Sequence, residues 1–536
     1  MTATTETPAP ARTRERVAPP PAPWHERLRR IRPPGGPRAQ IAALIVALVG
    51  LSAFLRTQAL GAGLWIDEGL SVGIASHGFL DIPGVLRQDG SPPLYYMLLH
   101  VWMAIFGRSE EAVHALSLLF SLLAIPTTLW AGWTLFGRRA GLIGAAVAAI
   151  LPFLTVYAQE ARMYTLMALL GLLATAGFLH VYVFRRRGYL PLFALALAGM
   201  LYTHVWALFF AAVAAGVLAT LARDAPDRPA LVRDGLIGFG AAGALFLPWV
   251  PSLVYQVLHT GAPWSTAPSL GNLVPSITGV LGGESAAVAL LLAAGAGLAA
   301  ALRLEGSRER TAVLATAALA GGTLLLAFLL SQVSPAWAPR YLAVIVGPVV
   351  LLVAAGLARA GRLGLVALAV IPLFWAQGFT DGIEGKSNAR DIAEKVGPLM
   401  RPRDLVVSTH PEQVPVLHYY LPGELDYATT LGPTADPRVM DWRDAMDRLR
   451  NSDTESALDP LIARLPPGGH VLLVRPIIGN DGPGWKAPWT KLVRKRSIRW
   501  GQALARDPRF LRIGRVSTRK LTRFGVRGML YLKTSR

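Results

Sequence analysis

Long apolar runs constrain this chain of 536 residues more than any other feature of its sequence. Many approach or exceed the roughly 20 residues that an α-helix needs to cross hydrocarbon, and they lack the alternation of barrel strands. With 53% hydrophobic and 16% charged residues, the composition is too apolar for an ordinary soluble domain. The sequence therefore predicts a polytopic all-α membrane domain. The runs fall near residues 39–60, 93–107, 112–135, 140–156, 163–184, 190–204, 205–222, 231–258, 286–302, 311–333, 340–358 and 362–379.

Basic loops decide which of these runs cross the membrane. If every run crossed, the short Arg-rich loops at 137–141, 184–188 and 221–233 would lie outside, against the positive-inside rule. The run 93–107 is short and rich in aromatic residues, so we assign it to an external juxtamembrane helix. About 11 transmembrane helices then remain, with the N-terminus cytoplasmic and the C-terminus extracytoplasmic.

The remaining sequence divides the chain into regions. Residues 1–38 read as a disordered, Pro- and Arg-rich cytoplasmic tail, and 39–380 as the transmembrane domain, whose first external loop is 61–111. From 385 to 536 the pattern is that of a small extracytoplasmic α/β domain. Its expected elements are strands at 404–409 and 470–476 and helices near 388–400 and 437–450.

Charge and cysteine content limit the partners of the chain. The net charge of +20 is explained by cytoplasmic loops and lipid-facing surfaces, so we predict anionic lipid and not nucleic acid as a partner. The segment from Trp485 onward is a strongly basic tail, which we expect to face solvent, lipid headgroups or an anionic acceptor. The chain has no cysteine, which excludes disulfides and thiolate metal sites.

Four segments with chemically active side chains reach the same external face in this topology: LWIDEGLS (64–71), VYAQEARMY (156–164), YTHVW (202–206) and SPAWAPRY (334–341). Asp67 and Glu68 are either a solvated helix end or a functional pair. Charged groups at membrane depth usually mark function, and apolar surroundings raise a carboxyl pKa toward that of a usable base. Either acid is therefore a candidate proton acceptor.

Two arginines of these segments are candidates for holding an anion. Arg162 lies at the start of a helix, where it opposes the helix dipole, and Arg340 begins a span after a proline. Each either extends to lipid headgroups or joins the other in binding a phosphate. His204 either orients a sugar or donor phosphate or pairs between helices. The other polar residues of the same segments are Tyr157, Glu160, Tyr164 and Tyr341.

A carboxylate base and two arginines at lipid depth describe glycosyl transfer from a lipid-phosphate sugar to a hydroxyl. The phosphate leaving group needs charge neutralisation more than protonation, which explains cations without an obvious general acid. Oxygen-rich sites also suit a divalent cation, so Asp67, Glu68, Glu160 and His204 form an alternative metal site. These residues follow no metal-ligand spacing, and we predict that no cofactor is required.

Six motifs in order resemble the bacterial membrane glycosyltransferases of the C-type superfold. They are LWIDEGLS, DGSPPLYYMLLHVWMAIFGRSEEAVHALS, LFGRRAG, VYAQEARMYTL, YTHVWALF and PRYLAVIVGPVVLL, and they cover roughly residues 40 to 380. They are similar to the protein O-mannosyltransferase-like family 39, which the aminoarabinose transferase acting on lipid A also resembles.

The resemblance implies an inverting transferase that takes a sugar from a polyprenyl monophosphate on the outer side of the membrane. It implies that Asp67 is the general base and Glu68 the second acid of the family's pair. It implies that Arg162 and Arg340 lie near the donor phosphate. Residues of the same cavity are Glu160, Tyr164 and Tyr341, and we add Tyr157 and His204 to the donor site and Asp89, Tyr95 and Tyr96 to the acceptor site or its loop.

An absent insert and the residue composition limit the range of acceptors and sugars that we expect. The β-trefoil insert of eukaryotic protein mannosyltransferases is absent, so an envelope glycan or glycolipid is favoured over the alternative, protein O-mannosylation. The high Ala, Gly, Pro and Arg content is typical of a GC-rich bacterium, for which mannose and arabinofuranose are the expected sugars. A lipid or polysaccharide transporter is a second class, but its charges normally lie at mid-membrane in matching halves. A membrane anchor would need one span and no clustered acids.

Overall fold

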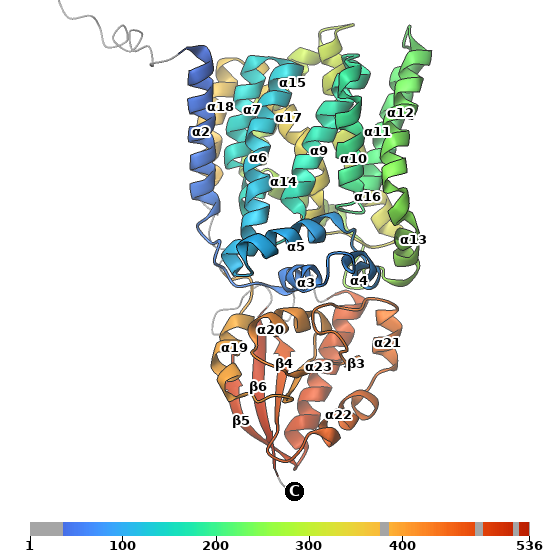
Figure 1. The fold of residues 1–536 in the computed structure, drawn as a ribbon. Helices are drawn as coiled ribbons and strands as arrows, with labels where there is room; N and C mark the ends of the chain where they lie inside the picture. Colours follow the sequence, from blue (N-terminus) through green and yellow to red (C-terminus); the bar gives the residue numbers. More distant parts are fainter. Residues whose placement is uncertain (1–35, 376–384, 478–485, 518–524, 535–536) are drawn as a thin grey trace, which may run out of the picture. The chain divides into compact units, whose positions relative to one another are not determined.

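The computed structural model describes residues 36–375, 385–477, 486–517 and 525–534 (Figure 1). Of the predicted tail, residues 1–38, the first 35 lie outside the described residues. Residues 36–47 belong to one unit of the chain, and Leu48 begins a second. The α-helices before the sheet are α2 (Pro37–Arg56), α3 (Ile66–Ala75), α4 (Ile82–Asp89), α5 (Leu94–Phe106), α6 (Glu110–Phe136), α7 (Arg138–Ile150), α8 (Pro152–Tyr157), α9 (Tyr164–Phe178), α10 (Leu190–Leu201), α11 (Ala207–Arg223), α12 (Arg228–Phe246), α13 (Val250–His259), α14 (Leu270–Val280), α15 (Glu284–Leu302), α16 (Arg308–Val333), α17 (Ala343–Arg359) and α18 (Arg362–Trp375).

Short helical turns extend several of these helices. They are η1 (Leu179–Val183), η2 (Arg187–Tyr189), η3 (Leu247–Trp249) and η4 (Pro339–Leu342). Among the described residues, seven helices, counted with these extensions, are long and apolar enough to cross a membrane. Three shorter apolar helices, α10, α11 and α18, match three further predicted runs. The chain is thus a polytopic helical membrane protein, and the fold class predicted from the sequence is confirmed.

The helix α5 corresponds to the short run that we assigned to a juxtamembrane position. It begins after Pro93 and ends at Gly107, whose φ of 87° favours glycine. Figure 1 shows α5 lying across the direction of α6 and α9 and not parallel to them. The next helix, α6, begins at once because the Ser109 side chain accepts a hydrogen bond from the backbone N–H of Ala112.

Glycines let the central span helices approach closely. The helices α9 and α17 pack against each other, and a Cβ at Gly347 of α17 would lie 2.3 Å from the backbone nitrogen of Leu172. The helices α15 and α17 pack in the same way, and a Cβ at Gly297 would lie 1.8 Å from the backbone oxygen of Gly356. Close backbone approach through small residues is how helices associate in lipid, where no hydrophobic force drives them together.

We predict that Gly297→Ala destabilises the protein whereas Gly295→Ala, on the same helix, does not. The alanine methyl at position 297 forces α15 away from α17, at a cost of about 1–3 kcal/mol, while position 295 has nothing within 4 Å. Thermal unfolding of the two variants in detergent measures the difference. Equal unfolding temperatures would show that the two helices do not meet at Gly297.

The C-terminal part of the chain forms a six-stranded sheet with the strand order β3-β2-β1-β4-β6-β5. The strand β1 pairs in parallel with β2 and β4, and the other pairs are antiparallel. The strands are β1 (Leu405–Ser408), β2 (Asp426–Thr429), β3 (Gly432–Pro433), β4 (His470–Pro476), β5 (Phe510–Val516) and β6 (Val526–Lys533). The helices and turns are α19 (Ala389–Val396), η5 (Gly397–Leu399), η6 (Pro411–Gln413), α20 (Val414–Tyr420), α21 (Ala445–Asn451), η7 (Thr454–Leu458), α22 (Asp459–Arg464) and α23 (Pro488–Arg506).

Helices cover both faces of this sheet, which explains its continuous apolar strands. Val406 and Leu472 belong to one buried cluster with Ile392 of α19 and Val416 of α20. The alternate residues of the same strands, such as Val407, point to the other face and belong to a second buried cluster with residues of α22 and α23. Successive side chains of a strand point to opposite faces, so strands buried on both faces read as unbroken apolar runs.

Two sequence predictions for this domain need correction. The region from Trp485 was expected to be a basic tail, but 488–506 form α23 and 510–516 and 526–533 form β5 and β6 of the sheet. Apolar residues such as Trp489 and Trp500 are buried at 0% exposure, and the basic residues between them hid this helical spacing. The helix expected over 437–450 is limited to α21.

The helix α3 packs against the sheet domain through two glycines spaced four residues apart, Gly69 against α20 and Gly73 against the segment that contains Arg438. A Cβ at Gly69 would lie 2.6 Å from the backbone nitrogen of Val416, and one at Gly73 would lie 1.9 Å from the backbone oxygen of Arg438. Residues four apart share a helix face. One face of α3 is therefore reserved for the sheet domain, and its other faces are free for the groups described next.

Candidate active site

The helix α3 carries the two predicted acids, and its geometry separates them. Asp67 and Ser71 lie four residues apart and share a face, and the Ser71 hydroxyl donates to the backbone oxygen of Asp67 at 3.0 Å. Glu68 is at the third helical position, where its Oε2 accepts from the backbone N–H of Trp65 at 3.2 Å. Adjacent residues of a helix point about 100° apart, so the carboxylates face different neighbours.

Arg162 is held against the Asp67 face of α3. Its Nη1 donates to the backbone oxygen of Asp67 at 3.2 Å and to the Ser71 hydroxyl at 3.1 Å, and it lies 3.5 Å from the Tyr96 hydroxyl. The Ser117 hydroxyl of α6 donates to the backbone oxygen of Arg162 at 2.9 Å. The position of this guanidinium is therefore fixed from both its side chain and its backbone.

Arg340 reaches the same acid from η4. Its Nη2 lies 3.3 Å from Asp67 Oδ2, and the two side chains are only 15% and 16% exposed. The guanidinium carbon lies 5.7 Å from the ring centre of Trp65, 5.6 Å from that of Trp264 and 5.5 Å from that of Tyr341. Cation–π contacts of this kind strengthen when the cation is desolvated.

The two guanidiniums keep donor capacity that the described residues do not use. Among those residues, the buried Nε atoms of Arg162 and Arg340 have no hydrogen-bond partner, and neither does the buried Oδ2 of Asp67, which only pairs with Arg340 by charge. A buried donor without a partner is costly. Two such donors beside one carboxylate form a site suited to an anion with several oxygens.

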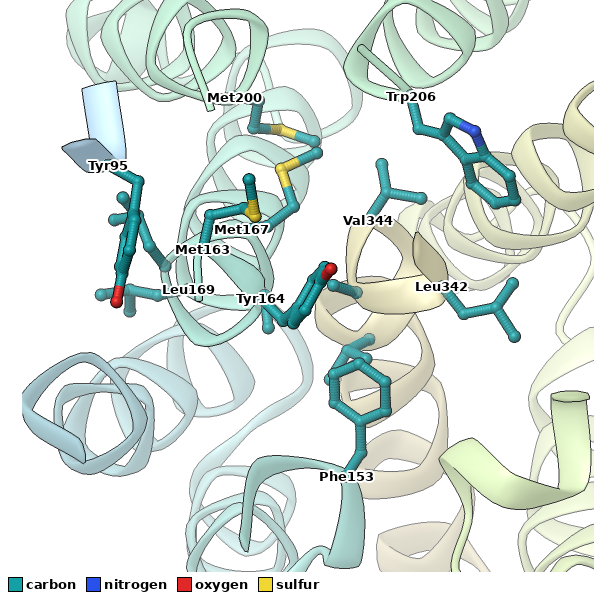
Figure 2. Packing of buried hydrophobic residues seen from close by; sticks show 14 of the residues in the cluster. Tyr95, Phe153, Met163, Tyr164, Met167, Leu169, Met200, Trp206, Leu342 and Val344 are labelled. Atoms are coloured by element: carbon teal, nitrogen blue, oxygen red, sulfur yellow. The ribbon is translucent and has the colours of Figure 1, made fainter. Parts of the chain in front are cut away.

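Aromatic rings line the side of the site toward α17. The ring centres of Tyr157 and Tyr164 are 5.0 Å apart, those of Tyr164 and Tyr341 6.5 Å, and those of Tyr341 and His204 4.5 Å. Figure 2 shows Phe153 directed toward Tyr164, close to the α17 ribbon. The structure thus brings these predicted donor-site residues together next to Arg340.

The predicted acceptor residues do not all lie at this site. Tyr95 lies apart from Tyr164, with Met163 between them (Figure 2), and its hydroxyl is 3.0 Å from that of Ser117, which in turn holds the backbone of Arg162. Asp89 interacts electrostatically with Arg162 and Asp67. Burial raises the pKa of the Asp89 carboxyl, although a hydrogen bond from Ser91 and the charge of Arg162 act in the opposite direction.

Glu68 lies on the other side of α3, in a buried charge cluster that also contains His114 and Lys386. Its side chain is 0% exposed. Its Oε1 lies 2.6 Å from His114 Nε2 and accepts from Lys386 Nζ at 3.0 Å and from the backbone N–H of Ala161 at 2.8 Å. Burial alone would raise the pKa of Glu68, but the charges of Lys386 and His114 outweigh it and lower the pKa from 4.5 to about 2.

The alternative metal ligands do not form a metal site in the described part of the chain. No group of three or more His, Asp or Glu side chains placed to share a metal ion occurs there. Glu160 is buried at 4% exposure and His204 packs on Tyr341. Metal dependence therefore stays an open prediction that rests on the sequence alone.

Sequence reasoning missed several residues that the structure adds to the site and its support, Ser71 and His114 among them. Trp65 and Trp264 flank Arg340, Ser117 holds Arg162, and Lys386 pairs with Glu68. Trp65 lies two residues before Asp67 in the same motif, which was a usable signal. Trp264 and Lys386 carried none, because their partners are 76 and 318 residues away in sequence.

We predict that Glu68→Gln lowers the free energy of unfolding at neutral pH, and that this loss becomes smaller as the pH falls. A carboxylate with a lowered folded-state pKa contributes stability above its unfolded pKa of about 4.5, and this is lost as the pH falls toward 2. The unfolding temperature of the variant, measured in detergent from pH 7 to pH 3, should lie below that of the wild type at pH 7 and approach it at pH 3. A constant difference would contradict the ion cluster.

The fold is similar to that of solved membrane glycosyltransferases of the C-type, as the six motifs predicted. ArnT from Cupriavidus metallidurans, solved in the apo state and bound to undecaprenyl phosphate, is similar with a TM-score of 0.63 and 15% identity, over 92% of this chain and 98% of that chain. Arabinofuranosyltransferase AftD from Mycobacteria is similar with a TM-score of 0.51 and 15% identity, over 94% of this chain and 40% of that one. No protein-family model matches the chain. No curated protein matches it significantly.

Proposed function

We propose that this protein is an inverting glycosyltransferase that moves a sugar from a polyprenyl monophosphate to a hydroxyl of a cell-envelope glycan or glycolipid. The observation that carries the proposal is the Asp67–Arg340 ion pair beside Arg162, with unused donors on both guanidiniums. The bound ligand of the similar ArnT structure, undecaprenyl phosphate, supports the choice of donor class. Mannose and arabinofuranose are the sugars to test, the second because of the likeness to AftD.

Donor binding exchanges the partner of Arg340. In the described structure Arg340 neutralises Asp67, and a donor phosphate placed between Arg162 and Arg340 competes for the same guanidinium. The planar guanidinium suits bidentate contact with phosphate oxygens. As the phosphate takes up the charge of Arg340, the Asp67 carboxylate becomes available to the acceptor. The base is thus released only when the donor is present.

Transfer then proceeds as a single displacement at the anomeric carbon. The acceptor oxygen forms the new glycosidic bond while the bond from the anomeric carbon to the phosphate oxygen breaks. The hydroxyl proton passes to Asp67, and the bonding pair leaves with the polyprenyl phosphate. Arg162 and Arg340 stabilise the charge that grows on this leaving group, which is why no general acid is needed. The rings of Tyr157, Tyr164 and Tyr341 help to exclude water from the reacting centre.

Glu68 and Tyr95 take supporting roles in this proposal, in place of the catalytic and acceptor roles given to them by sequence. Both are fully buried and engaged with groups that hold Arg162 and α3. Asp89 is the alternative proton acceptor, since burial raises the pKa of its carboxyl. We place the site on the extracytoplasmic face of a bacterial cell membrane, where anionic lipid contacts the basic surfaces of the chain.

The first test is donor consumption by purified Asp67→Asn protein. Offered a panel of polyprenyl-phosphate sugars, the wild type should release polyprenyl phosphate, and Asp67→Asn should lose at least about 10²-fold in kcat because the base is removed. Asp81→Asn, at an exposed acid before α4, is the matched control and should transfer normally. Full transfer by Asp67→Asn would refute the base assignment, and its loss in Asp89→Asn instead would move the role to Asp89.

A second test asks whether the guanidinium geometry of the two arginines matters for phosphate binding, beyond their positive charge. Arg340→Lys and Arg162→Lys keep one positive charge but lose the planar fork, so the affinity for undecaprenyl phosphate should fall by about tenfold or more in each. Equilibrium binding in detergent measures this, with Arg310→Lys, on α16, as the matched control. Unchanged affinity in both site variants would show that the phosphate binds elsewhere.

A further inference from the structure

The Glu68 cluster joins four parts of the chain that are distant in sequence. Glu68 belongs to α3, His114 to α6, Ala161 to the turn before α9, and Lys386 to the start of the sheet domain. Lys386 Nζ also donates to the backbone oxygen of Gln159 at 2.9 Å. One lysine of the sheet domain therefore contacts both α3 and the turn that carries Arg162.

This contact lies one residue from each proposed donor-site group. Asp67 directly precedes Glu68, and Arg162 directly follows Ala161, whose N–H the Glu68 carboxylate accepts. Lys386 is 4% exposed and Glu68 0%, so the pair is desolvated and its geometry is strongly specified. A shift of Glu68 would move the first turn of α3 and the 159–162 turn together.

Resting on the function proposed above, we propose that Lys386 is a positioning residue: by holding Glu68 and Gln159, it sets Asp67 and Arg162 at the spacing that the donor phosphate requires. The sheet domain thereby completes the donor site without contacting the donor. A molecule in which this domain is not docked on α3 would bind the donor weakly. The chemistry of Asp67 is thus coupled to domain docking.

A second ion pair between the sheet domain and the membrane helices supplies the matched control. Arg390 of α19 pairs with Glu110 of α6 and donates to the backbone oxygen of Gly61 at 2.9 Å. It contacts neither α3 nor the 159–162 turn through the hydrogen bonds described for it. Arg390→Gln therefore removes one ion pair between the sheet domain and the membrane helices and leaves the Glu68 contact in place, while Lys386→Met, which has nearly the same length as lysine, removes the contact to Glu68.

The experiment compares wild type, Lys386→Met, Arg390→Gln and the double variant Glu68→Gln/Lys386→Met. It measures undecaprenyl phosphate affinity, kcat and KM for the donor, and amide hydrogen exchange of peptides covering 156–164. Because small misplacement of reacting groups costs about 10²-fold in rate, Lys386→Met should lose on the order of tenfold to 10²-fold in kcat/KM. Exchange over 159–162 should rise in Lys386→Met and stay unchanged in Arg390→Gln.

The double variant keeps the test decisive if Lys386→Met does not fold, because it leaves no lone buried carboxylate. It should still bind the donor weakly, because neither side chain of the pair remains to hold the 159–162 turn. Normal donor affinity in the double variant, or equal losses in Lys386→Met and Arg390→Gln, would overturn the positioning role. If the wild type neither binds nor consumes any polyprenyl-phosphate sugar, the proposed function fails, while a rise in 159–162 exchange would still show the coupling.

Discussion

The ion cluster around Glu68 is the interaction on which the rest of the site depends. A carboxylate at 0% exposure is tolerated only because Lys386, His114 and the N–H of Ala161 surround it. Such a cluster contributes little net stability compared with apolar packing, but the loss of one partner is costly. It therefore acts mainly as a geometric constraint, because it fixes the start of α3 against α6, the turn before α9 and the sheet domain.

The three faces of α3 then have separate tasks. Gly69 and Gly73 admit the backbone of the sheet domain, Glu68 enters the ion cluster, and Asp67 faces the two arginines. The sheet domain acts on the site indirectly, by fixing the position of α3, and among the described residues it contributes no hydrogen bond or ion pair to Asp67. The glycines also explain why α3, only 10 residues long, is so completely buried. A short helix held on three sides gives Asp67 little freedom, which suits the role of base that we propose for it.

Much of the fold and part of the site could be predicted from the sequence. Apolar runs and basic loops predicted the bundle and the juxtamembrane α5, since span length and loop charge are local properties. The one-faced topology gathered Asp67, Arg162, Arg340 and the tyrosines. What the sequence did not show depends on tertiary contacts: that Asp67 and Glu68 face apart, that Tyr95 supports Arg162 through Ser117, and that Lys386 enters the cluster. The basic segment after Trp485 was misread because its charges concealed Trp489 and Trp500 on the buried side of α23.

An experimental structure of the full chain with undecaprenyl phosphate bound tests the role of the two arginines most sharply. We expect the phosphate to lie between Arg162 and Arg340 and to bind their Nε donors, and we expect the Asp67–Arg340 contact of 3.3 Å to be longer than it is here. Glu68 should keep its contacts with Lys386 and His114. A phosphate bound away from both arginines, with the Asp67–Arg340 pair intact, would refute the proposed donor site.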